Sequence, residues 1–517
     1  MFRILAITGF LSVSFLSLGQ QNSVMLNSFY KDRMFMHLDE KVAPNGSFLP
    51  VFESQFSSNV TLRDSTKQYY EFTEMIFKKH LFEAKGANYY VTISPILDFS
   101  LGKDKKDTNE RRLFQNTRGV FVEGDLLKNF SFSTSFYENQ ARFTRYESAY
   151  YSEIGELYPN QSTGQYNTQN AVVPGSARTK PFKTDGFDYA YAIGNLVYKP
   201  TKWLILSAGN TSHFVGDGYR SVLLSDNGVP SPFFRISAQI SKKWQFNTMR
   251  TRLINLMRKP VSTTVEAYYE TKGYSSNYFT FQPNDKWSIS LFEGIVWSKG
   301  DSITSKKVNP LFYNPVPFVA EFALSKQEIN SVLGLNVSFV LNERNRFYGQ
   351  LAIGNLNSKK AAMQLGWRAY NYFGLKDLML QLEFNSVTNG MYQSENIRLN
   401  YSQYNLPMAH IKGNSFHEFI LRSNYEWKRC YIDLKSVVYM LSNYSSVDLL
   451  PVSKVNQQES GTLTVLNIEM GYRFNRKMNL NLFGGINSRT DIQSGMGNAQ
   501  HIFIGLRTGI TNRYTDF

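Results

Sequence analysis

Residues 89–101 read Tyr-Tyr-Val-Thr-Ile-Ser-Pro-Ile-Leu-Asp-Phe-Ser-Leu, and they alternate between two chemical types. Every second position from Tyr89 to Leu101 is apolar or aromatic, whereas the other face includes Thr92 and Asp98. Successive side chains of a β-strand point to opposite faces, so this stretch predicts a strand with one apolar and one wet face. A soluble β-sandwich shows the same alternation, but its strands are usually shorter.

The same period of two recurs along the chain, for example over 130–136, 363–368, 377–384 and 502–510. We expect about 18 strands, beginning near residues 88, 114, 130, 187, 202, 232, 245, 275, 287, 331, 346, 361, 377, 415, 431, 461, 478 and 502. An even number is typical of bacterial single-chain barrels, and it means that the chain enters and leaves the barrel on the same side of the membrane. The predicted fold is all-β, a transmembrane antiparallel β-barrel over residues 88–517 whose last strand closes at Phe517.

The connections between these strands differ in length. Short polar turns are expected at 128–129, 199–202, 241–243, 283–286, 342–345, 373–376, 428–429 and 475–477. Longer segments alternate with them near 103–113, 143–186, 213–231, 257–274, 299–330, 355–360, 392–414, 442–460 and 489–500. This asymmetry is typical of bacterial barrels with short periplasmic turns and long outer loops.

The composition excludes other classes of protein. Aromatic residues make up 15% of the 517 residues and charged residues only 19%, which argues against a disordered chain. A mean hydropathy of −0.33 is too polar for a bundle of membrane helices. The single cysteine, Cys430, excludes an intramolecular disulfide. The net charge of +15 fits either a solvated rim or attraction to acidic polysaccharide or lipid headgroups.

The N-terminal 87 residues are expected to lie outside the barrel wall. Residues 1–19 read as a secretory signal peptide, with Arg3 before an apolar run and small residues before Gln20. Residues 20–87 form a predicted periplasmic segment with a helix near 66–84, which either lids the barrel or docks a partner. The predicted location of the mature chain is the bacterial outer membrane.

One stretch in the middle of the chain is specific to a family. Residues 207–227 read Ser-Ala-Gly-Asn-Thr-Ser-His-Phe-Val-Gly-Asp-Gly-Tyr-Arg-Ser-Val-Leu-Leu-Ser-Asp-Asn. This stretch resembles the signature of Wzi-type capsule-assembly outer-membrane proteins, and most closely their Bacteroidota RemB-like branch, which is associated with gliding motility. Further similar segments are TRGVFVEG (117–124), SFYENQ (135–140), VPG (173–175), LFEGIVW (291–297), NPLFYNPVPF (309–318), NYSQYNLPMAH (400–410) and GLRTGITNRYTDF (505–517).

The resemblance implies an 18-stranded barrel with periplasmic N-terminal helices and a surface role in holding capsular or other exported polysaccharide. For the RemB-like branch it implies a link to motility instead. The C-terminal segment, with Tyr514 and Phe517, also resembles an outer-membrane insertion signal.

Three predicted outer loops carry the candidate sugar-binding residues, which combine aromatic rings with amides, carboxylates and one arginine. These residues are Asp217, Tyr219, Arg220, Asp226, Asn227, Tyr313, Asn314, Glu321, Tyr401, Tyr404 and His410. The same loops are equally expected to fold inward and plug the lumen, with Arg220 paired to Asp217 or Asp226. Convergence of Arg220, Asp226 and His410 in an open cleft would favour binding, and their mutual burial would favour plugging.

The residues give little support for an enzyme. Ser212 and His213 are neighbours on a predicted strand and would point to opposite faces, so they form no nucleophile–base pair. The six histidines show no metal-ligand spacing, and no cofactor is expected. Basic residues recur in turns and do not gather on one element, so nucleic acid is not an expected partner.

The leading hypothesis is therefore a non-enzymatic outer-membrane barrel that binds or anchors capsular polysaccharide or exopolysaccharide through inward-folded outer loops. The first alternative is an accessory barrel of a gliding-motility or protein-secretion assembly, with partner proteins. The second alternative is a porin-like channel. Other expected partners are outer-membrane lipid and the barrel-insertion machinery during biogenesis.

Overall fold

The computed structural model describes residues 26–38, 40–52, 79–127, 129–160, 162–258, 269–299, 308–324, 328–354, 359–453, 459–492, 497–509 and 511–517. The predicted signal peptide, residues 1–19, lies outside these residues. The predicted helix near 66–84 also lies mostly outside them, and in its described part Phe82–Lys85 form a strand, β2. In the described part of the chain, no helix is both long enough and apolar enough to cross a membrane.

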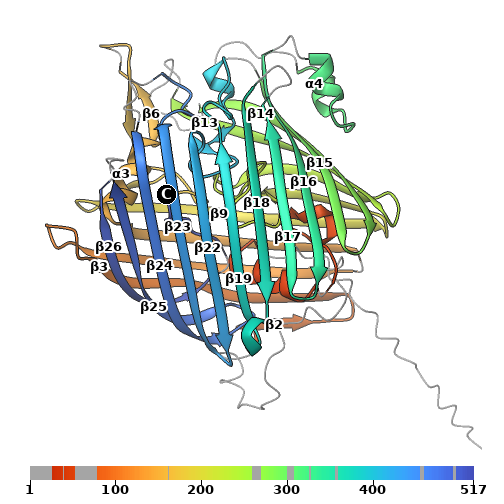
Figure 1. Ribbon diagram of the computed structural model, residues 1–517, viewed down its shortest axis with the longest axis horizontal. Helices are drawn as coiled ribbons and strands as arrows, with labels where there is room; N and C mark the ends of the chain where they lie inside the picture. The colour runs from red at the N-terminus through yellow and green to blue at the C-terminus, as the bar shows by residue number, and fades with distance from the viewer. Residues whose placement is uncertain are drawn as a thin grey trace, which may run out of the picture.

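Within the described residues, eighteen antiparallel strands form a closed barrel, as predicted (Figure 1). They are β3 (Tyr89–Asp104), β4 (Arg112–Leu126), β5 (Phe130–Arg142), β9 (Gly186–Thr201), β10 (Leu204–Thr211), β12 (Ser231–Gln239), β13 (Trp244–Arg258), β14 (Tyr269–Asn284), β15 (Trp287–Ser298), β16 (Ile329–Asn342), β17 (Asn345–Ile353), β18 (Ala361–Tyr370), β19 (Leu378–Val387), β22 (Phe416–Trp427), β23 (Cys430–Tyr444), β24 (Glu459–Asn475), β25 (Leu480–Ile492) and β26 (Ala499–Thr508). The observed starts lie close to the predicted ones, with the largest difference at Tyr269, which was expected near 275.

The barrel closes where β26 pairs with β3, from His501 opposite Asp104 to Arg507 opposite Asp98. The prediction that the last strand runs to Phe517 is wrong, because β26 ends at Thr508. Along the same edge of β3, residues Tyr90–Ile93 pair with β2. Closure leaves no free edge along most of the wall, which a barrel in lipid requires.

The alternation of the sequence sorts the side chains between lipid and lumen. On β3, Phe99 and Leu101 are exposed on the outer face, whereas Thr92, Ser94 and Ile96 are buried. Other exposed outward residues include Phe136, Leu196, Phe234, Leu291, Phe347, Leu351, Leu365, Leu382, Phe419, Leu421, Met470, Leu482 and Ile504. This apolar band is the surface that a bilayer covers.

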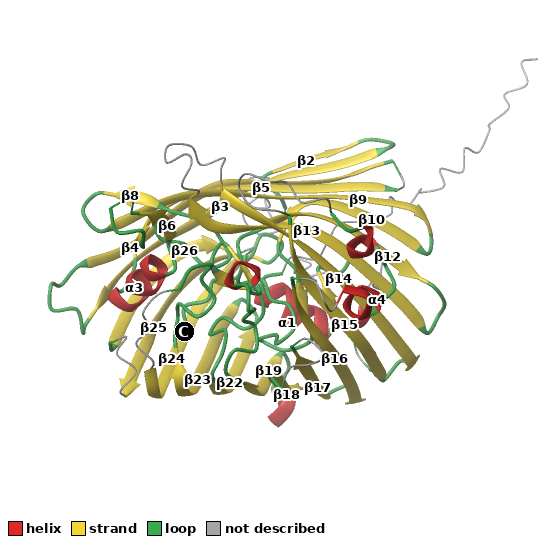
Figure 2. Ribbon diagram, turned by 90° about the horizontal axis from the view of Figure 1, so that it is seen from above, coloured by secondary structure: helices red, strands yellow, loops and turns green. Residues whose placement is uncertain are grey.

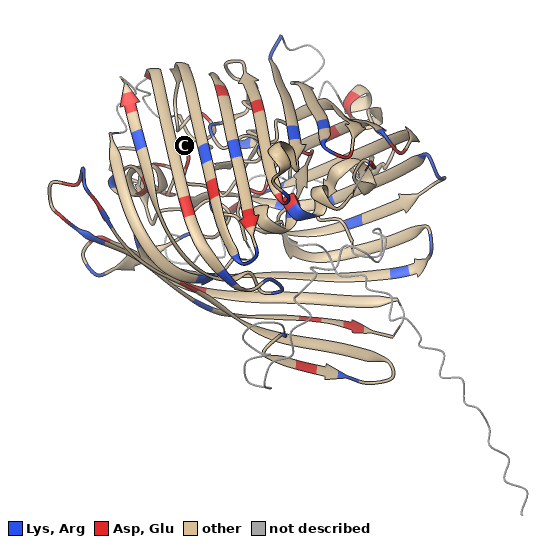
Figure 3. Ribbon diagram, turned by 60° about the horizontal axis from the view of Figure 1, so that its bottom comes forward, with Lys and Arg blue, Asp and Glu red and all other residues tan. Residues whose placement is uncertain are grey.

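The two ends of the barrel differ, as the loop pattern predicted. At the short-turn end, asparagines close several turns: Asn284 Oδ1 accepts the backbone N–H groups of Lys286 and Trp287, at 2.9 and 3.1 Å. Asx turns of this kind favour tight connections. At the long-loop end lie the described residues of the longer connections, 105–111, 143–160, 162–185, 212–230, 308–324, 359–360, 388–415, 445–453 and 497–498. Lys and Arg recur in these turns and loops (Figure 3).

The remaining elements are short and belong to the segments before and between the barrel strands. They are α1 (Ser28–Met36), η1 (Pro44–Ser47), β1 (Phe48–Leu49), α3 (Arg145–Glu153), β6 (Glu156–Pro159), β7 (Tyr166–Gln169), β8 (Lys180–Phe182), β11 (Phe214–Val215), η4 (Pro310–Tyr313), α4 (Val319–Leu324), η5 (Tyr372–Gly374), η6 (Ile397–Leu399), β20 (Ser402–Gln403) and β21 (Leu406–Pro407). A capping box of Thr144 and Glu147 starts α3, and the Asn27 side chain caps α1 by accepting the N–H of Phe29.

Candidate functional site

Three segments of the chain meet inside the barrel and fill much of its lumen (Figure 2). We call residues 26–52 the N-terminal segment, residues 212–230 the motif loop, and residues 509 and 511–517 the tail. The N-terminal segment contributes α1 and β1, and β1 pairs with β11 of the motif loop. The expected periplasmic location of residues 20–87 is therefore wrong for the described residues of 26–52, because the Gly46 and Pro50 carbonyl oxygens and the Asp32 carboxylate accept hydrogen bonds from inward-facing side chains of the wall.

The N-terminal segment is fixed by ion pairs to the wall. Asp32 of α1 lies 2.8 Å from Arg422 on β22 and 3.2 Å from Arg368 on β18. Its neighbour Lys31 donates to the carbonyl oxygen of Gly218 in the motif loop, at 2.7 Å. Burial is the largest influence on the pKa of Asp32, but Arg422 and Arg368 outweigh it and lower that pKa. Asp32 therefore stays ionised and holds α1 in the lumen.

Arg220 lies at the centre of the three segments and is 1% exposed. Its Nε is 3.2 Å from Glu418 Oε1 on β22, and its Nη2 is 3.0 Å from Asp516 Oδ1 of the tail. Burial opposes the charge of Arg220, but Asp516, Tyr439 and Glu418 together outweigh burial and raise the pKa of Arg220. The predicted pairing with Asp217 or Asp226 is wrong, because its partners come from a distant strand and from the tail.

The two predicted aspartates of the motif loop have other partners. Asp217 accepts a hydrogen bond from the Ser47 hydroxyl of the N-terminal segment. Asp226 accepts from the Tyr514 hydroxyl at 2.7 Å and from Asn512 Nδ2 at 3.0 Å, both in the tail. Each aspartate therefore joins the motif loop to a different segment of the plug.

The backbone of the motif loop is held by the wall as well. The backbone N–H groups of Tyr219 and Arg220 donate to the carboxylate of Glu383 on β19, at 2.7 and 3.0 Å. Gly216 has a φ of +116° and lies so close to Gln350 that a Cβ would come within 2.2 Å of Gln350 Nε2. Only glycine fits this close approach of the loop to β17.

His410 joins a second loop to the same centre. Its Nδ1 accepts the backbone N–H of Lys412 at 3.2 Å, so the ring hydrogen lies on Nε2 and is donated to Glu418 at 2.6 Å. Burial lowers the pKa of His410 more than Glu418 raises it, and the ring is neutral. Arg220, Asp226 and His410 are thus buried, and each is bonded to the wall or to the tail, which is the arrangement expected of a plug.

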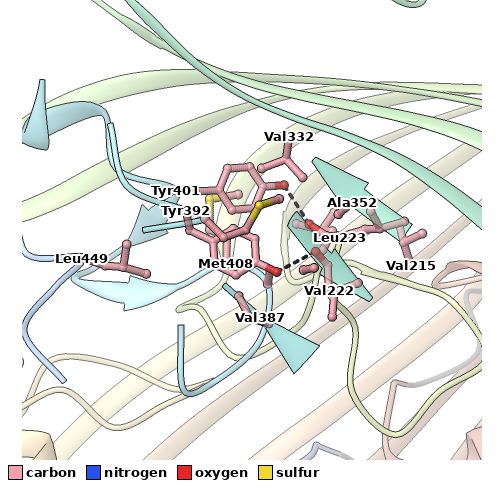
Figure 4. Packing of buried hydrophobic residues seen from close by; sticks show 14 of the residues in the cluster. Val215, Val222, Leu223, Val332, Ala352, Val387, Tyr392, Tyr401, Met408 and Leu449 are labelled. Carbon is pink, nitrogen blue, oxygen red and sulfur yellow. Dashed lines mark hydrogen bonds between the residues drawn. The ribbon is translucent and has the colours of Figure 1, made fainter. Parts of the chain in front are cut away.

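Apolar packing completes the plug around Leu223 and Tyr401 (Figure 4). The Tyr401 hydroxyl donates to the Leu223 carbonyl oxygen at 3.0 Å and lies 2.9 Å from the Tyr274 hydroxyl. Asn227 Nδ2 donates to the Ala409 carbonyl oxygen at 2.6 Å, which ties the motif loop to residues 400–410. The three aliphatic residues Val222–Leu224 are fully or almost fully buried here.

The other predicted residues do not join this centre. Tyr313, Asn314 and Glu321 belong to η4, α4 and the turn between them, which cover the outer side of the wall at β13–β15 (Figure 1). The Asn314 carbonyl oxygen accepts from Arg250 at 2.9 Å, and Glu321 is buried. Tyr404 is partly exposed and donates its backbone N–H to the Ile254 carbonyl oxygen of β13.

The tail crosses the lumen instead of ending in the wall. It leaves Thr508 at the short-turn end, and Phe517 packs against α3 of the long-loop end, with ring centroids 4.3 Å from Tyr150. Tyr514 and Phe517 are therefore lumenal and not on a lipid-facing strand. Their role as an insertion signal remains a prediction. A polar cavity of about 320 Å³ lies beside the tail and α1, between them and the wall.

Sequence reasoning missed Glu383, Glu418, Lys435 and Asp516. The two glutamates stand at inward positions that the strand alternation reveals, where a charge needs a lumenal partner. The strand alternation could therefore have identified Glu383 and Glu418 as lumenal, but it could not have identified Arg220 as their partner. Within the described residues, no three His, Cys, Asp or Glu side chains gather to hold a metal ion.

No protein-family model matches the chain, and no curated protein matches it in sequence. Among solved structures it is similar to Wzi of Escherichia coli, described as an outer-membrane protein involved in group 1 capsule assembly and a carbohydrate-binding β-barrel. The two are 12% identical with a TM-score of 0.51, over 80% of this chain and 84% of Wzi. This is the fold of an outer-membrane β-barrel. The likeness agrees with the predicted barrel architecture, whereas the RemB-like branch remains a prediction.

Two further similarities are weaker. OprD of Pseudomonas aeruginosa is 10% identical with a TM-score of 0.43, over 80% of this chain and 94% of OprD. OccAB2 of Acinetobacter baumannii is 9% identical with a TM-score of 0.41, over 82% of this chain and 98% of OccAB2.

Proposed function

We propose that this chain is a non-enzymatic outer-membrane barrel that binds or anchors capsular or other exported polysaccharide at the cell surface. The observation that carries the proposal is the plug: Arg220, Glu418 and Asp516 fix the motif loop and the tail to the wall, and an ion pair of Asp32 to the wall fixes the N-terminal segment. A lumen filled in this way leaves the long-loop end as the surface that can act on an external ligand. The fold likeness to a carbohydrate-binding barrel supports the same reading.

The predicted sugar-binding residues divide into two groups under this proposal. Arg220, Asp226 and His410 shape the loops from inside and do not touch sugar, because they are buried and bonded to Glu418 of the wall or to the tail. Tyr404 and Tyr313 are the predicted residues that an external polysaccharide reaches most readily, since both are at least partly exposed. Ligand contact therefore belongs to the loop surfaces.

Deletion of the protein tests the proposal in cells. Polysaccharide retained on the cells is compared with polysaccharide shed to the medium, in the deletion strain and after complementation. We expect retention to fall and shedding to rise, with total synthesis unchanged. Unchanged retention in the deletion strain would exclude an anchoring function.

A second candidate function is an accessory role in a motility or secretion assembly. The observation that favours it is an apolar patch on η4, α4 and the turn between them, where Tyr313, Val316 and Phe322 are 55%, 54% and 68% exposed. Exposed apolar patches of this kind often mark contacts with other proteins. Affinity purification from gently solubilised membranes tests this role, using Phe322→Ser and the control Phe373→Ser at the short-turn end. A stoichiometric partner that only Phe322→Ser loses would support it, and a lone wild-type barrel would exclude it.

A further inference from the structure

The barrel wall is lower over two neighbouring strands at the long-loop end. β10 pairs with β9 only as far as Asn210 opposite Gly194, and β12 pairs with β13 only as far as Phe233 opposite Thr251. β9 and β13 both continue beyond these pairs. We call the resulting gap, between residues 189–193 and 252–256, the notch. Beyond it, β8 pairs with β9 over Gly186–Asp188, and β6 pairs with β13 at Met257. Three strand spacings of roughly 4.8 Å make it about 14 Å wide.

Side chains and loop residues make hydrogen bonds to backbone groups along both edges of the notch. Asn210 Nδ2 donates to the Ala192 carbonyl oxygen of β9 at 2.8 Å. On the opposite edge, Gln403 Oε1 accepts the N–H of Ile254 at 2.7 Å, and the N–H of Tyr404 donates to the Ile254 carbonyl oxygen at 2.9 Å. Strand edges with satisfied backbone groups form a stable opening and not a frayed one.

A cavity of about 640 Å³ occupies the notch. This volume lies within the range of roughly 300–1,000 Å³ that is typical of small-molecule sites. Its lining is rich in tyrosine, cations and amides, with Tyr189, Tyr191, Tyr269, Tyr404, Arg178, Lys180, Arg252, Asp188, Asn210 and Gln403. These are the groups that stack on sugar rings and bridge hydroxyls.

The aromatic side of the cavity is rigid. Tyr191 stacks on Tyr137 of β5 with ring centroids 4.4 Å apart and an angle of 6° between the rings. Arg178 is fixed as well, because its Nη1 lies 3.1 Å from the buried carboxylate of Glu156. A ligand in the notch would therefore meet surfaces that are already ordered, which lowers the entropy lost on binding.

Two cations at the mouth are free to take an anionic ligand. Lys180 and Arg252 are exposed, and neither side chain makes a hydrogen bond or ion pair with any residue that the structure describes. Asp188, which lies directly opposite Lys180 in the β8–β9 register, is the one carboxylate of the lining. Positive charge therefore predominates at the mouth.

We propose that the notch binds an anionic saccharide, a segment of an acidic polysaccharide whose carboxylates meet Lys180 and Arg252 and whose rings lie against the tyrosines. This inference rests on the proposed polysaccharide-binding function and names its site and ligand class. The plug centre around Arg220 has no part in this site, because its charges are already paired inside the lumen.

Titration of the purified full chain in detergent with polygalacturonate and with neutral dextran tests the proposal. The double variant Lys180→Gln/Arg252→Gln removes two charges from the notch. The matched control Lys103→Gln/Lys183→Gln removes two exposed charges from the same end of the barrel, outside the cavity lining. Heat-modifiable migration on gels confirms that each variant is folded.

We expect polygalacturonate to bind wild type more tightly than dextran, and the notch variant to lose about tenfold in affinity, because a charge-assisted contact contributes on that scale. The control should bind like wild type. Equal binding by the notch variant and wild type would overturn the notch while leaving the proposed function intact. Equal losses in both double variants would also overturn it, since they indicate general charge attraction. Failure of wild type to bind any polysaccharide would refute the proposed function itself.

Discussion

Replacing Asp516 by Asn removes the carboxylate that ties the tail to the rest of the plug. This carboxylate lies 3.0 Å from Arg220 Nη2 and 2.9 Å from Lys435 Nζ, and it is 1% exposed. Burial alone would raise the pKa of Asp516, but Arg220 and Lys435 outweigh it and hold that pKa below its ordinary value. The variant leaves both cations buried with one fewer partner.

The expected loss follows from this burial. Removing one member of a buried ion pair costs about 3–5 kcal/mol. Glu418 still pairs with Arg220 in the variant, so we expect the lower end of this range. A loss of about 3 kcal/mol lowers the equilibrium constant for docking of the tail by roughly a hundredfold. The tail lines the 320 Å³ lumenal cavity, so its release should widen that cavity and open a path for ions.

Single-channel recording in planar bilayers measures this release. We expect little conductance from wild type and frequent openings from Asp516→Asn at neutral pH. The matched control is Asp285→Asn, whose ion pair with Lys41 is 3.7 Å long and largely exposed, and such pairs contribute little. Closed channels in Asp516→Asn at neutral pH would contradict the assigned role of the carboxylate.

The pH dependence adds a second readout. A carboxyl group with a depressed folded pKa stabilises the docked tail above its ordinary pKa of about 3.9, and this stability is lost as the pH falls through the folded value. Wild type should therefore gain conductance in acid, whereas Asp516→Asn should lack this acid step. An identical acid response in both proteins would show that another group controls the plug.

Substitutions at three further positions test other parts of the structure. Gly216→Ala should destabilise the protein by about 1–3 kcal/mol in urea titrations, because φ is +116° and the added Cβ meets Gln350. Lys412→Met should raise stability at pH 7: burial lowers the Lys412 pKa to about 7, and among the described residues its Nζ has no hydrogen-bond partner. Wild-type stability should then rise between pH 7 and about 10, where only the unfolded chain keeps this proton, and the variant should lose that rise. Leu365→Lys should cost about 2–4 kcal/mol in lipid, and Leu365→Ala less, because Leu365 faces the bilayer with 59% exposure.

The wall of this barrel is predictable from the sequence because its rule is local. Alternation such as that of 89–101 fixes which side chains face lipid, and neighbouring strands pair in chain order. Turn residues such as Asn284 mark where each hairpin closes. The strand starts and the short and long connections follow from these two local signals.

The plug was less predictable because its contacts are not local. Arg220 and Glu418 are 198 positions apart, and Arg220 and Asp516 are 296 apart, so no spacing rule connects them. The sequence predicts a last strand that runs to Phe517, because the C-terminal segment resembles an outer-membrane insertion signal, whereas β26 ends at Thr508. The notch was missed for a related reason, since it arises from the different lengths of β9, β10, β12 and β13.

The contact between the N-terminal segment and the tail constrains the order of folding. Asn27 Nδ2 donates to the Thr511 carbonyl oxygen and the N–H of Ser28 donates to Asn512 Oδ1, over a separation of 484 positions in each case. Hairpins of the wall need only short loop closures, whereas this contact needs most of the chain in place, which makes it slow to form. The strands of the barrel can therefore pair while the lumen is still empty, and the plug docks last. A newly inserted molecule would pass through a leaky stage, and the lifetime of that stage would measure how fast the plug assembles.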